Sequence, residues 1–196
     1  MKPTLFLIIL TVVMSGHPPV ISQDLEFYRE VIVFQIQEEA VITDAEYYFC
    51  NVGDKDIRTL LFYPFPAQTM DLIDSLMVLD MGSKEIIPYR EGKSGVFFEI
   101  FVKAYGQSAY RVYFRQKDNE GHFKYILNST ASWGRPLEFA GYELQMPSSF
   151  IIDSLNYSPD TSFIQNDIQY FIWKKADFIP DKDFEIFYFD SSGTWR

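Results

Sequence analysis

The stretch EVIVFQIQEEAVITDAEYYFCN, residues 30–51, decides the fold because its side chains alternate with a period of two. Successive side chains of an extended chain point to opposite faces, so Ile32 and Phe34 share one face and the residues between them share the other. The alternation stops at EEA and resumes with Tyr47 and Phe49. This pattern predicts a pair of β-strands, and the following NVGDKD predicts a turn.

Runs of the same kind recur along the chain, and none shows helical periodicity over a dozen residues. VFFEIFVK (96–103) places alternate apolar residues on a core face, and the prolines that follow RTLLFY end that strand or place it at an edge. Turn residues predict two further hairpins, one joining 75–80 to 85–90 and one joining 108–116 to 121–127. Four more strands are predicted in YELQMP, FIIDSLNY, IQYFIWKK and DFEIFYFD.

Ten to twelve short strands separated by turns predict an all-β fold, an antiparallel two-sheet sandwich of immunoglobulin-like or jelly-roll type. Little or no helix is expected outside the signal peptide described next. Residues 23–196 are long enough to bury a single core, and we expect one domain. The alternative is a tandem of two small sandwiches divided near residues 104–108.

The N-terminus carries the features of a secretory signal peptide. Lys2 precedes an apolar run from Leu5 to Met14, and the helix-breaking SGHPP follows at 15–19. The run is too short to span a bilayer, which takes about 20 residues. We therefore predict residues 1–22 to be a cleavable signal peptide, cut after Ser22, and the protein to be secreted or periplasmic, with no integral membrane segment in the mature chain.

The charge balance limits the partners. The formal net charge is −10, and a surface this acidic repels nucleic acid and anionic lipid. A protein or a glycan of the cell envelope remains a suitable partner, and basic proteins, cationic sugars and Ca²⁺ are compatible with the charge. Acidic turns such as 51–56 offer oxygen ligands, but none has the regular ligand spacing of an EF-hand.

The residues leave little room for catalysis. Cys50 is the single cysteine and is expected to be a half-buried strand residue, and His122 is the only histidine after the signal peptide. These cannot form a His/Cys metal cluster, and GxSxG, phosphate-loop and HExxH motifs are absent. We predict no cofactor and no metal. A glycoside hydrolase with paired carboxylates remains the enzymatic alternative. Glu99 and Glu185 lie in hydrophobic segments and are the acids whose pKa values desolvation would raise most, although both are expected to face outward.

Aromatic residues make up 18% of the chain, and most are expected to fill the core. Those at predicted loop edges are the candidate ligand-binding residues, together with an arginine: Tyr105, Trp133, Arg135, Tyr142 and Trp173. For YILNSTASWGRP (125–136) the structural alternative is favoured, in which the indole plugs one end of the sandwich and the arginine pairs with Glu138 or another nearby carboxylate.

Two phrases, AEYYFCNVGDKDIRTLLFYPFP and YILNSTASWGRPLEFAGYELQMP, carry a family resemblance. The chain resembles exported bacterial domains of unknown function that contain a Tyr-Ile-Leu-x-Thr-x-x-x-Trp-x-x-Pro type segment, matched here through Tyr125, Ile126, Leu127, Trp133 and Pro136. The first phrase departs from the family pattern in the order of its prolines and aromatic residue. The resemblance implies an extracytoplasmic β-sandwich with no established activity and no catalytic residue.

These observations predict a non-catalytic binding or structural module that recognises a protein or glycan of the cell envelope. A carbohydrate-active hydrolase is one alternative. An assembly partner is another, in which the edge strand that ends at Pro64 and Pro66 offers its backbone groups to an added strand.

Overall fold

The computed structural model describes residues 24–67, 69–117 and 121–190, so the predicted signal peptide lies outside the described residues. Thirteen strands and two 3₁₀ turns follow one another in this part of the chain. They are β1 (Leu25–Ile36), β2 (Ala40–Asn51), β3 (Ile57–Pro64), η1 (Met70–Leu72), β4 (Ile73–Asp80), β5 (Tyr89–Gly92), β6 (Gly95–Val102), β7 (Gln107–Lys117), β8 (His122–Tyr125), η2 (Asn128–Trp133), β9 (Leu137–Pro147), β10 (Phe150–Leu155), β11 (Thr161–Gln165), β12 (Ile168–Phe178) and β13 (Phe184–Asp190).

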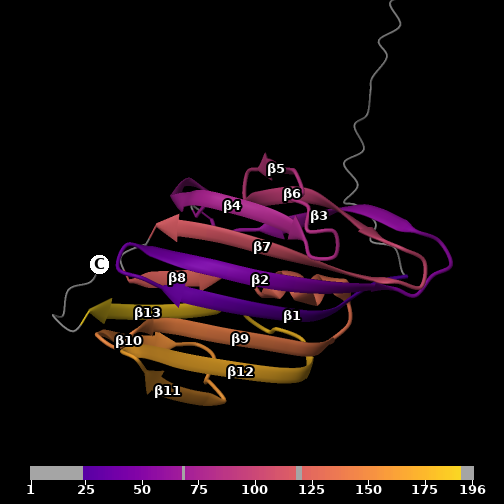
Figure 1. Cartoon of the computed structure of the whole chain (residues 1–196). Helices are drawn as coiled ribbons and strands as arrows, with labels where there is room; N and C mark the ends of the chain where they lie inside the picture. The colour runs from indigo at the N-terminus through magenta and orange to yellow at the C-terminus, as the bar shows by residue number, and fades with distance from the viewer. Residues whose placement is uncertain (1–23, 68, 118–120, 191–196) are drawn as a thin grey trace, which may run out of the picture.

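The strands form one large sheet and two small ones (Figure 1). The seven-stranded sheet has the order β11-β12-β9-β1-β2-β7-β4, and the three-stranded sheets have the orders β10-β13-β8 and β3-β6-β5. Named pairs are antiparallel except β1 with β9, which run parallel from Arg29 opposite Phe139 to Gln35 opposite Gln145. The all-β sandwich expected from the sequence is confirmed, with this one parallel pair inside it.

Both small sheets cover the same face of the large sheet. Phe34 on β1 stacks on Phe184 of β13, with ring centroids 4.9 Å apart, and Phe114 on β7 meets Phe65, just after β3, edge to face at 5.0 Å. Phe34 and Phe114 both lie opposite Thr43 in the neighbouring registers, so they share a face. The core therefore lies between one large sheet and two small ones placed side by side.

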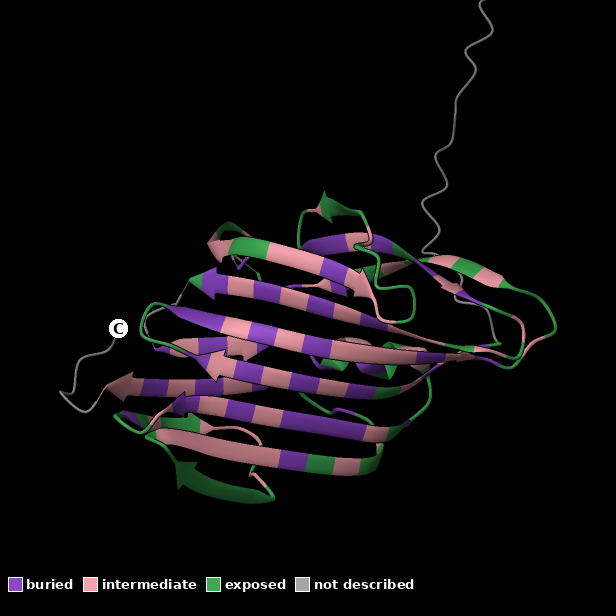
Figure 2. Ribbon diagram, viewed as in Figure 1, coloured by how far each residue is buried: buried purple, intermediate pink, exposed green. Residues whose placement is uncertain are grey.

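Burial follows the predicted alternation. Stripes of buried and half-buried residues run along the strands in Figure 2, and Val96, Phe98, Ile100 and Val102 are all buried, as expected. β3 pairs only with β6, which agrees with the predicted edge position. The large sheet takes strands from both sides of residues 104–108, since β1 and β2 share it with β9 and β12.

Of the two additional hairpins predicted from turn residues, the one joining 75–80 to 85–90 forms only beside its turn, where the Asp80 N–H donates to the carbonyl oxygen of Glu85 and the Ile87 N–H donates to that of Val78. The one joining 108–116 to 121–127 is wrong in its pairing. β7 lies between β2 and β4 in the large sheet, whereas β8 pairs with β13 in a small sheet, because Phe123 and Tyr125 of β8 bury against Phe34 across the sandwich. Residues 85–90 contribute a single bridge, Leu79 to Ile86, and the chain then turns to pair β5 with β6.

Candidate functional site

The segment YILNSTASWGRP connects the two layers of the sandwich. It leaves β8, forms η2, and enters β9 after Gly134, whose φ of 70° is the left-handed conformation that glycine adopts readily at the end of a turn. The turn delivers the Trp133 ring onto Phe27 and Phe49, at centroid distances of 5.5 and 5.6 Å. The indole is half-buried against the core, as the structural alternative expected.

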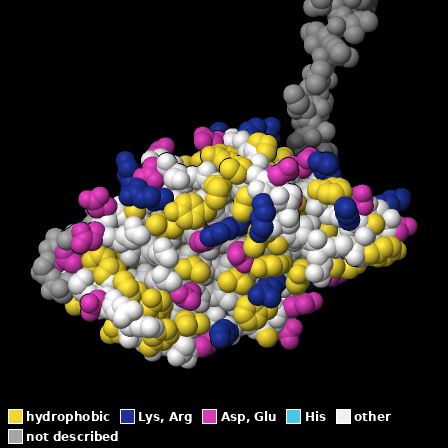
Figure 3. Space-filling view, viewed as in Figure 1, with side chains coloured by type: hydrophobic (Ala, Val, Ile, Leu, Met, Phe, Trp, Pro, Cys, Tyr) yellow, Lys and Arg dark blue, Asp and Glu magenta, His cyan; other side chains and the backbone are white. Residues whose placement is uncertain are grey.

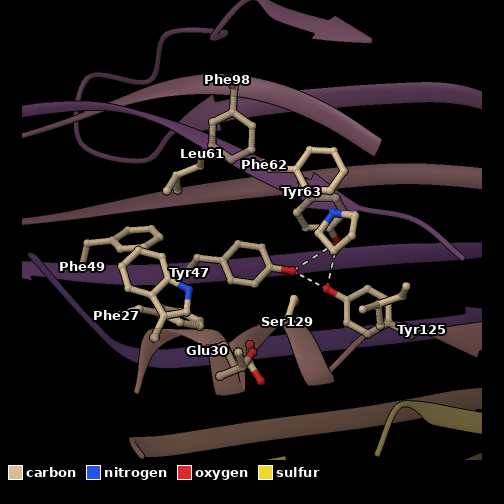
Figure 4. Close-up of a pocket in the computed structure, with 14 residues that line it drawn as sticks. Phe27, Glu30, Tyr47, Phe49, Leu61, Phe62, Tyr63, Phe98, Tyr125 and Ser129 are labelled. Carbon is tan, nitrogen blue, oxygen red and sulfur yellow. Dashed lines mark hydrogen bonds between the residues drawn. The ribbon is translucent and has the colours of Figure 1, made fainter. Parts of the chain in front are cut away.

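A pocket of about 70 Å³ lies beside Trp133, between the large sheet, β3 and η2 (Figure 4). Its wall is mainly aromatic, and the described residues that line it include three tyrosines and three polar side chains without a ring. The lining residues of this Glu30 pocket are Phe27, Glu30, Tyr47, Phe49, Leu61, Phe62, Tyr63, Pro64, Phe98, Tyr125, Ile126, Ser129, Thr130 and Trp133.

Glu30 is the buried acid of this site. It is 1% exposed and shares the inward face of β1 with Ile32 and Phe34. The Tyr142 hydroxyl on β9 donates a hydrogen bond to Oε1, and no described residue donates to Oε2. Burial raises the pKa of Glu30 from 4.5 to about 7, and the bond from Tyr142 opposes part of that rise. At neutral pH the carboxyl group therefore exists in both protonation states.

Three tyrosine hydroxyls meet next to this acid. Tyr47 donates to Tyr63 at 3.1 Å, the hydroxyls of Tyr63 and Tyr125 are 2.8 Å apart, and Tyr125 is also hydrogen-bonded to Tyr47. Figure 4 shows the three hydroxyls pointing toward one another from β2, β3 and β8. Burial raises the pKa of each tyrosine in this cluster, and the charge of Glu30 raises it further, so all three stay protonated.

The candidate residues named from the sequence fall in different places. Trp133 lines the Glu30 pocket, whereas Arg135 lies on the surface and pairs with Glu26, the other nearby carboxylate that the structural alternative allowed in place of Glu138. Tyr105 is 74% exposed, with a φ of 55°, in the turn between β6 and β7, and does not line the pocket.

Tyr142 and Trp173 are corrections, because neither presents a ring to solvent. Tyr142 is 5% exposed and reaches the site through its hydroxyl alone. Trp173 is 1% exposed, packs edge to face on Phe184 at 5.4 Å, and donates from Nε1 to the carbonyl oxygen of Tyr157 at 3.2 Å. The period of β9 and β12 turns both rings inward, where large aromatic groups fill the core.

Sequence reasoning missed Glu30, although a signal was present. An acid in phase with Ile32 and Phe34 falls on the buried face of its strand. The two acids named from the sequence face outward, as expected. Glu99 is exposed and pairs with Arg58, and Glu185 is half-buried and contacts His122 Nε2 at 2.9 Å.

The outer face of the large sheet offers no broad aromatic platform. Figure 3 shows acidic, basic and hydrophobic side chains interspersed over this face. Arg111 forms a bidentate salt bridge with Asp44. The Arg29 guanidinium lies over the rings of Tyr48 and Phe139, 4.9 and 5.2 Å from their centroids. The Arg29 side chain thus covers the Tyr48 and Phe139 rings, and the exposed Phe163, stacked on Tyr170 at 4.9 Å, lies apart from them on β11.

A second hollow of about 520 Å³ lies between β4 and β5 and carries Asp71, Asp74 and Glu91. All three carboxylates are exposed, and Asp74 is paired with Arg115. Within residues 24–67, 69–117 and 121–190, no three His, Cys, Asp or Glu side chains gather as a metal site would require. In the same ranges no helix is long and apolar enough to cross a membrane. Cys50 is half-buried, as expected.

No protein-family model and no curated protein sequence matches the chain. Solved structures do. A candidate nutrient-binding protein from Legionella pneumophila aligns with a TM-score of 0.68 and 14% identity, over 85% of this chain and 67% of that one. An M1 zinc metallopeptidase from Deinococcus radiodurans aligns with a TM-score of 0.50 and 8% identity, over 84% of this chain and 42% of the peptidase. At these identities the likeness shows the fold alone.

Proposed function

We propose that this chain is an exported, non-catalytic binding module that receives a small group of its partner, a protein or glycan of the cell envelope, in the Glu30 pocket. The observation that carries the proposal is a glutamate, only 1% exposed, that lines an aromatic pocket and has one carboxyl oxygen to which no described residue donates. Buried polar groups ordinarily have their hydrogen bonds made within the protein. A group that lacks one and lines a pocket is suited to a ligand.

The Legionella protein of similar fold, described as nutrient-binding, supports a binding role for this architecture. Fold likeness does not carry a ligand from one protein to another, so the ligand must be argued from the site. The exported location rests on the predicted signal peptide and on the resemblance to exported bacterial domains, and it is part of the proposal.

The alternative functions have weaker support. A two-carboxylate glycosidase needs acids on both sides of the scissile bond, and Glu30 is the only acid lining this pocket in the described part of the chain. The three acids of the second hollow are solvated, and one is held in an ion pair. Strand addition at β3 would use an edge that ends at a proline, which lacks an N–H to donate.

The test is a thermal-shift screen with amines, amino acids, sugars and short peptides. A ligand present at a hundred times its Kd adds about 2.7 kcal/mol of stability. The variant Ser129→Trp places an indole in the pocket mouth, and Ser132→Trp on the same 3₁₀ turn is the matched control, because Ser132 is exposed and does not line the pocket.

We expect at least one ligand to stabilise the wild type and Ser132→Trp but not Ser129→Trp. Ligands that stabilise all three proteins equally would place binding elsewhere and overturn the proposal. A complete screen without any stabilising ligand for the wild type would also count against it.

A further inference from the structure

We infer that the Glu30 pocket binds an alkylammonium group, the protonated end of an aliphatic amine; this inference rests on the binding function proposed above. Its first support is the direction of the available hydrogen bonds. Each hydroxyl of the tyrosine cluster has one hydrogen, and a closed ring of three bonds uses all three of them. What remains on these oxygens, and on Oε2 of Glu30 when the carboxyl group is ionised, is the capacity to accept.

The charges in the site point the same way. No Lys, Arg or His side chain lines the pocket within the described ranges, and its one ionisable acid is Glu30. The groups that face this carboxyl are tyrosines from each packed element: Tyr142 of β9, Tyr47 of β2, Tyr63 of β3 and Tyr125 of β8. All are neutral, so the carboxylate has no counter-ion, and a bound cation would supply one.

The aromatic wall suits a cation as well. Phe27, Phe49 and Trp133 form a contiguous group of rings with centroids 5.3 to 5.6 Å apart, and all three line the pocket. Ring faces attract ammonium groups, by about 0.5–1 kcal/mol at exposed sites and about 2 kcal/mol or more where water is removed. An anion would find neither a positive charge nor a free tyrosine donor here.

The size of the pocket limits the ligand. Its volume of about 70 Å³ is roughly half that of an engineered cavity of about 150 Å³ that holds benzene. An ammonium head with its first methylene groups fits this space, whereas an aromatic or sugar ring does not. The ammonium group can come from a free amine or from a lysine side chain of a partner protein, and the formal charge of −10 attracts both.

The experiment is calorimetric titration with n-butylammonium chloride, with n-butanol and sodium butyrate as uncharged and anionic counterparts. We expect butylammonium to bind at least tenfold more tightly than either. The amine stays protonated, since such groups have a pKa of about 10.4. The ionised fraction of Glu30 rises from about one tenth at pH 6 to about nine tenths at pH 8, so affinity should rise about tenfold.

The variant Glu30→Gln keeps an acceptor for Tyr142 and removes the charge, and should lose at least tenfold in affinity and the pH dependence. Glu99→Gln, an exposed acid on β6, is the matched control and should bind as the wild type does. If Glu30→Gln fails to fold, two other results test the inference: the pH dependence of butylammonium binding to the wild type, and the loss of that binding in Ser129→Trp. Binding of a lysine peptide that is far tighter than that of butylammonium, and is lost when the lysine is acetylated, would identify a partner protein as the source of the ammonium group.

Equal affinity for butanol, unchanged binding by Glu30→Gln, or no binding of butylammonium would overturn the inference. These outcomes can be distinguished from a failure of the proposed binding function. If another ligand binds the wild type and is excluded by Ser129→Trp while butylammonium does not bind, the binding module stands and only the ligand class is wrong.

Discussion

Replacing Glu30 by glutamine should stabilise the protein at alkaline pH and leave its stability nearly unchanged in acid. In the unfolded chain this carboxyl has a pKa of 4.5, and in the folded protein burial raises it to about 7. Between these values the folded state keeps a proton that the unfolded state has released. The free energy of unfolding therefore falls as pH rises, by 1.36 kcal/mol per pH unit, or about 3 kcal/mol in all.

The assay is urea unfolding of the wild type and Glu30→Gln over a series of pH values from about 4 to 8. Other carboxyl groups titrate in both proteins, so the difference between the two curves isolates Glu30. We expect the difference to be near zero below pH 4.5 and to grow until about pH 7, with Glu30→Gln the more stable. A pH-independent difference would refute the reasoning from burial, and Glu99→Gln should show no such growth.

Four further substitutions test side-chain packing and backbone strain by urea unfolding. Thr43→Val should stabilise by about 1 kcal/mol, because the buried Thr43 Oγ1 has no hydrogen-bond partner and valine has the same shape; a loss of stability would reveal a hidden partner. Trp133→Ala should lower the free energy of unfolding by about 2 kcal/mol, which is less than the loss for a fully buried tryptophan because this ring is half-buried. Unchanged stability with lost ligand binding would mean that the ring serves binding and not packing. Gly95→Ala should cost about 2 kcal/mol or more, since its Cβ would lie 2.2 Å from the carbonyl oxygen of Tyr63, and a mild effect would mean that β3 yields easily. Tyr105→Gly should stabilise by about 0.5 kcal/mol by relieving a φ of 55° without altering binding at the Glu30 pocket; weaker binding would restore Tyr105 as a site residue.

The sequence predicted the layers well because the period of two is a local property. The core face of β6 and the edge position of β3 both followed from side chains a few residues apart. Partners of a strand are not local. The same polar turn can return the chain to its neighbour or carry it across the sandwich, which is why the pairing of β7 with β8 was wrong. The parallel contact of β1 with β9 joins residues about a hundred positions apart and leaves no turn signal.

The candidate site was only partly predictable, for a related reason. Trp133 was found because Gly134 and Pro136 mark its turn, and its role in packing followed from its type. Tyr142 and Trp173 look exposed when their segments are read alone, and only the assembled sheet turns them inward. The pocket is formed by strands from distant parts of the chain, so no short motif encodes it.

The burial of Glu30 depends on a β-bulge. Leu25 and Phe27 would set a phase that turns Glu30 outward, while Ile32 and Phe34 set one that turns it inward, and both pairs are buried. The register of β1 against β2 shifts between Phe27 and Arg29, and this extra residue reconciles the two phases. The bulge thus brings an aromatic ring and an acid to the same face of one strand.

This arrangement costs stability, which bears on its purpose. Glu30 has a hydrogen bond from Tyr142 but no counter-ion, and the expected loss of about 3 kcal/mol at high pH is a large fraction of the 5–15 kcal/mol typical of a domain. Glutamine at position 30 would keep the bond from Tyr142 without that cost. A fold shaped by stability alone would favour it, so the acid is better explained by a cation that neutralises it: binding would lower the pKa of Glu30 and recover the lost stability in proportion to ligand concentration.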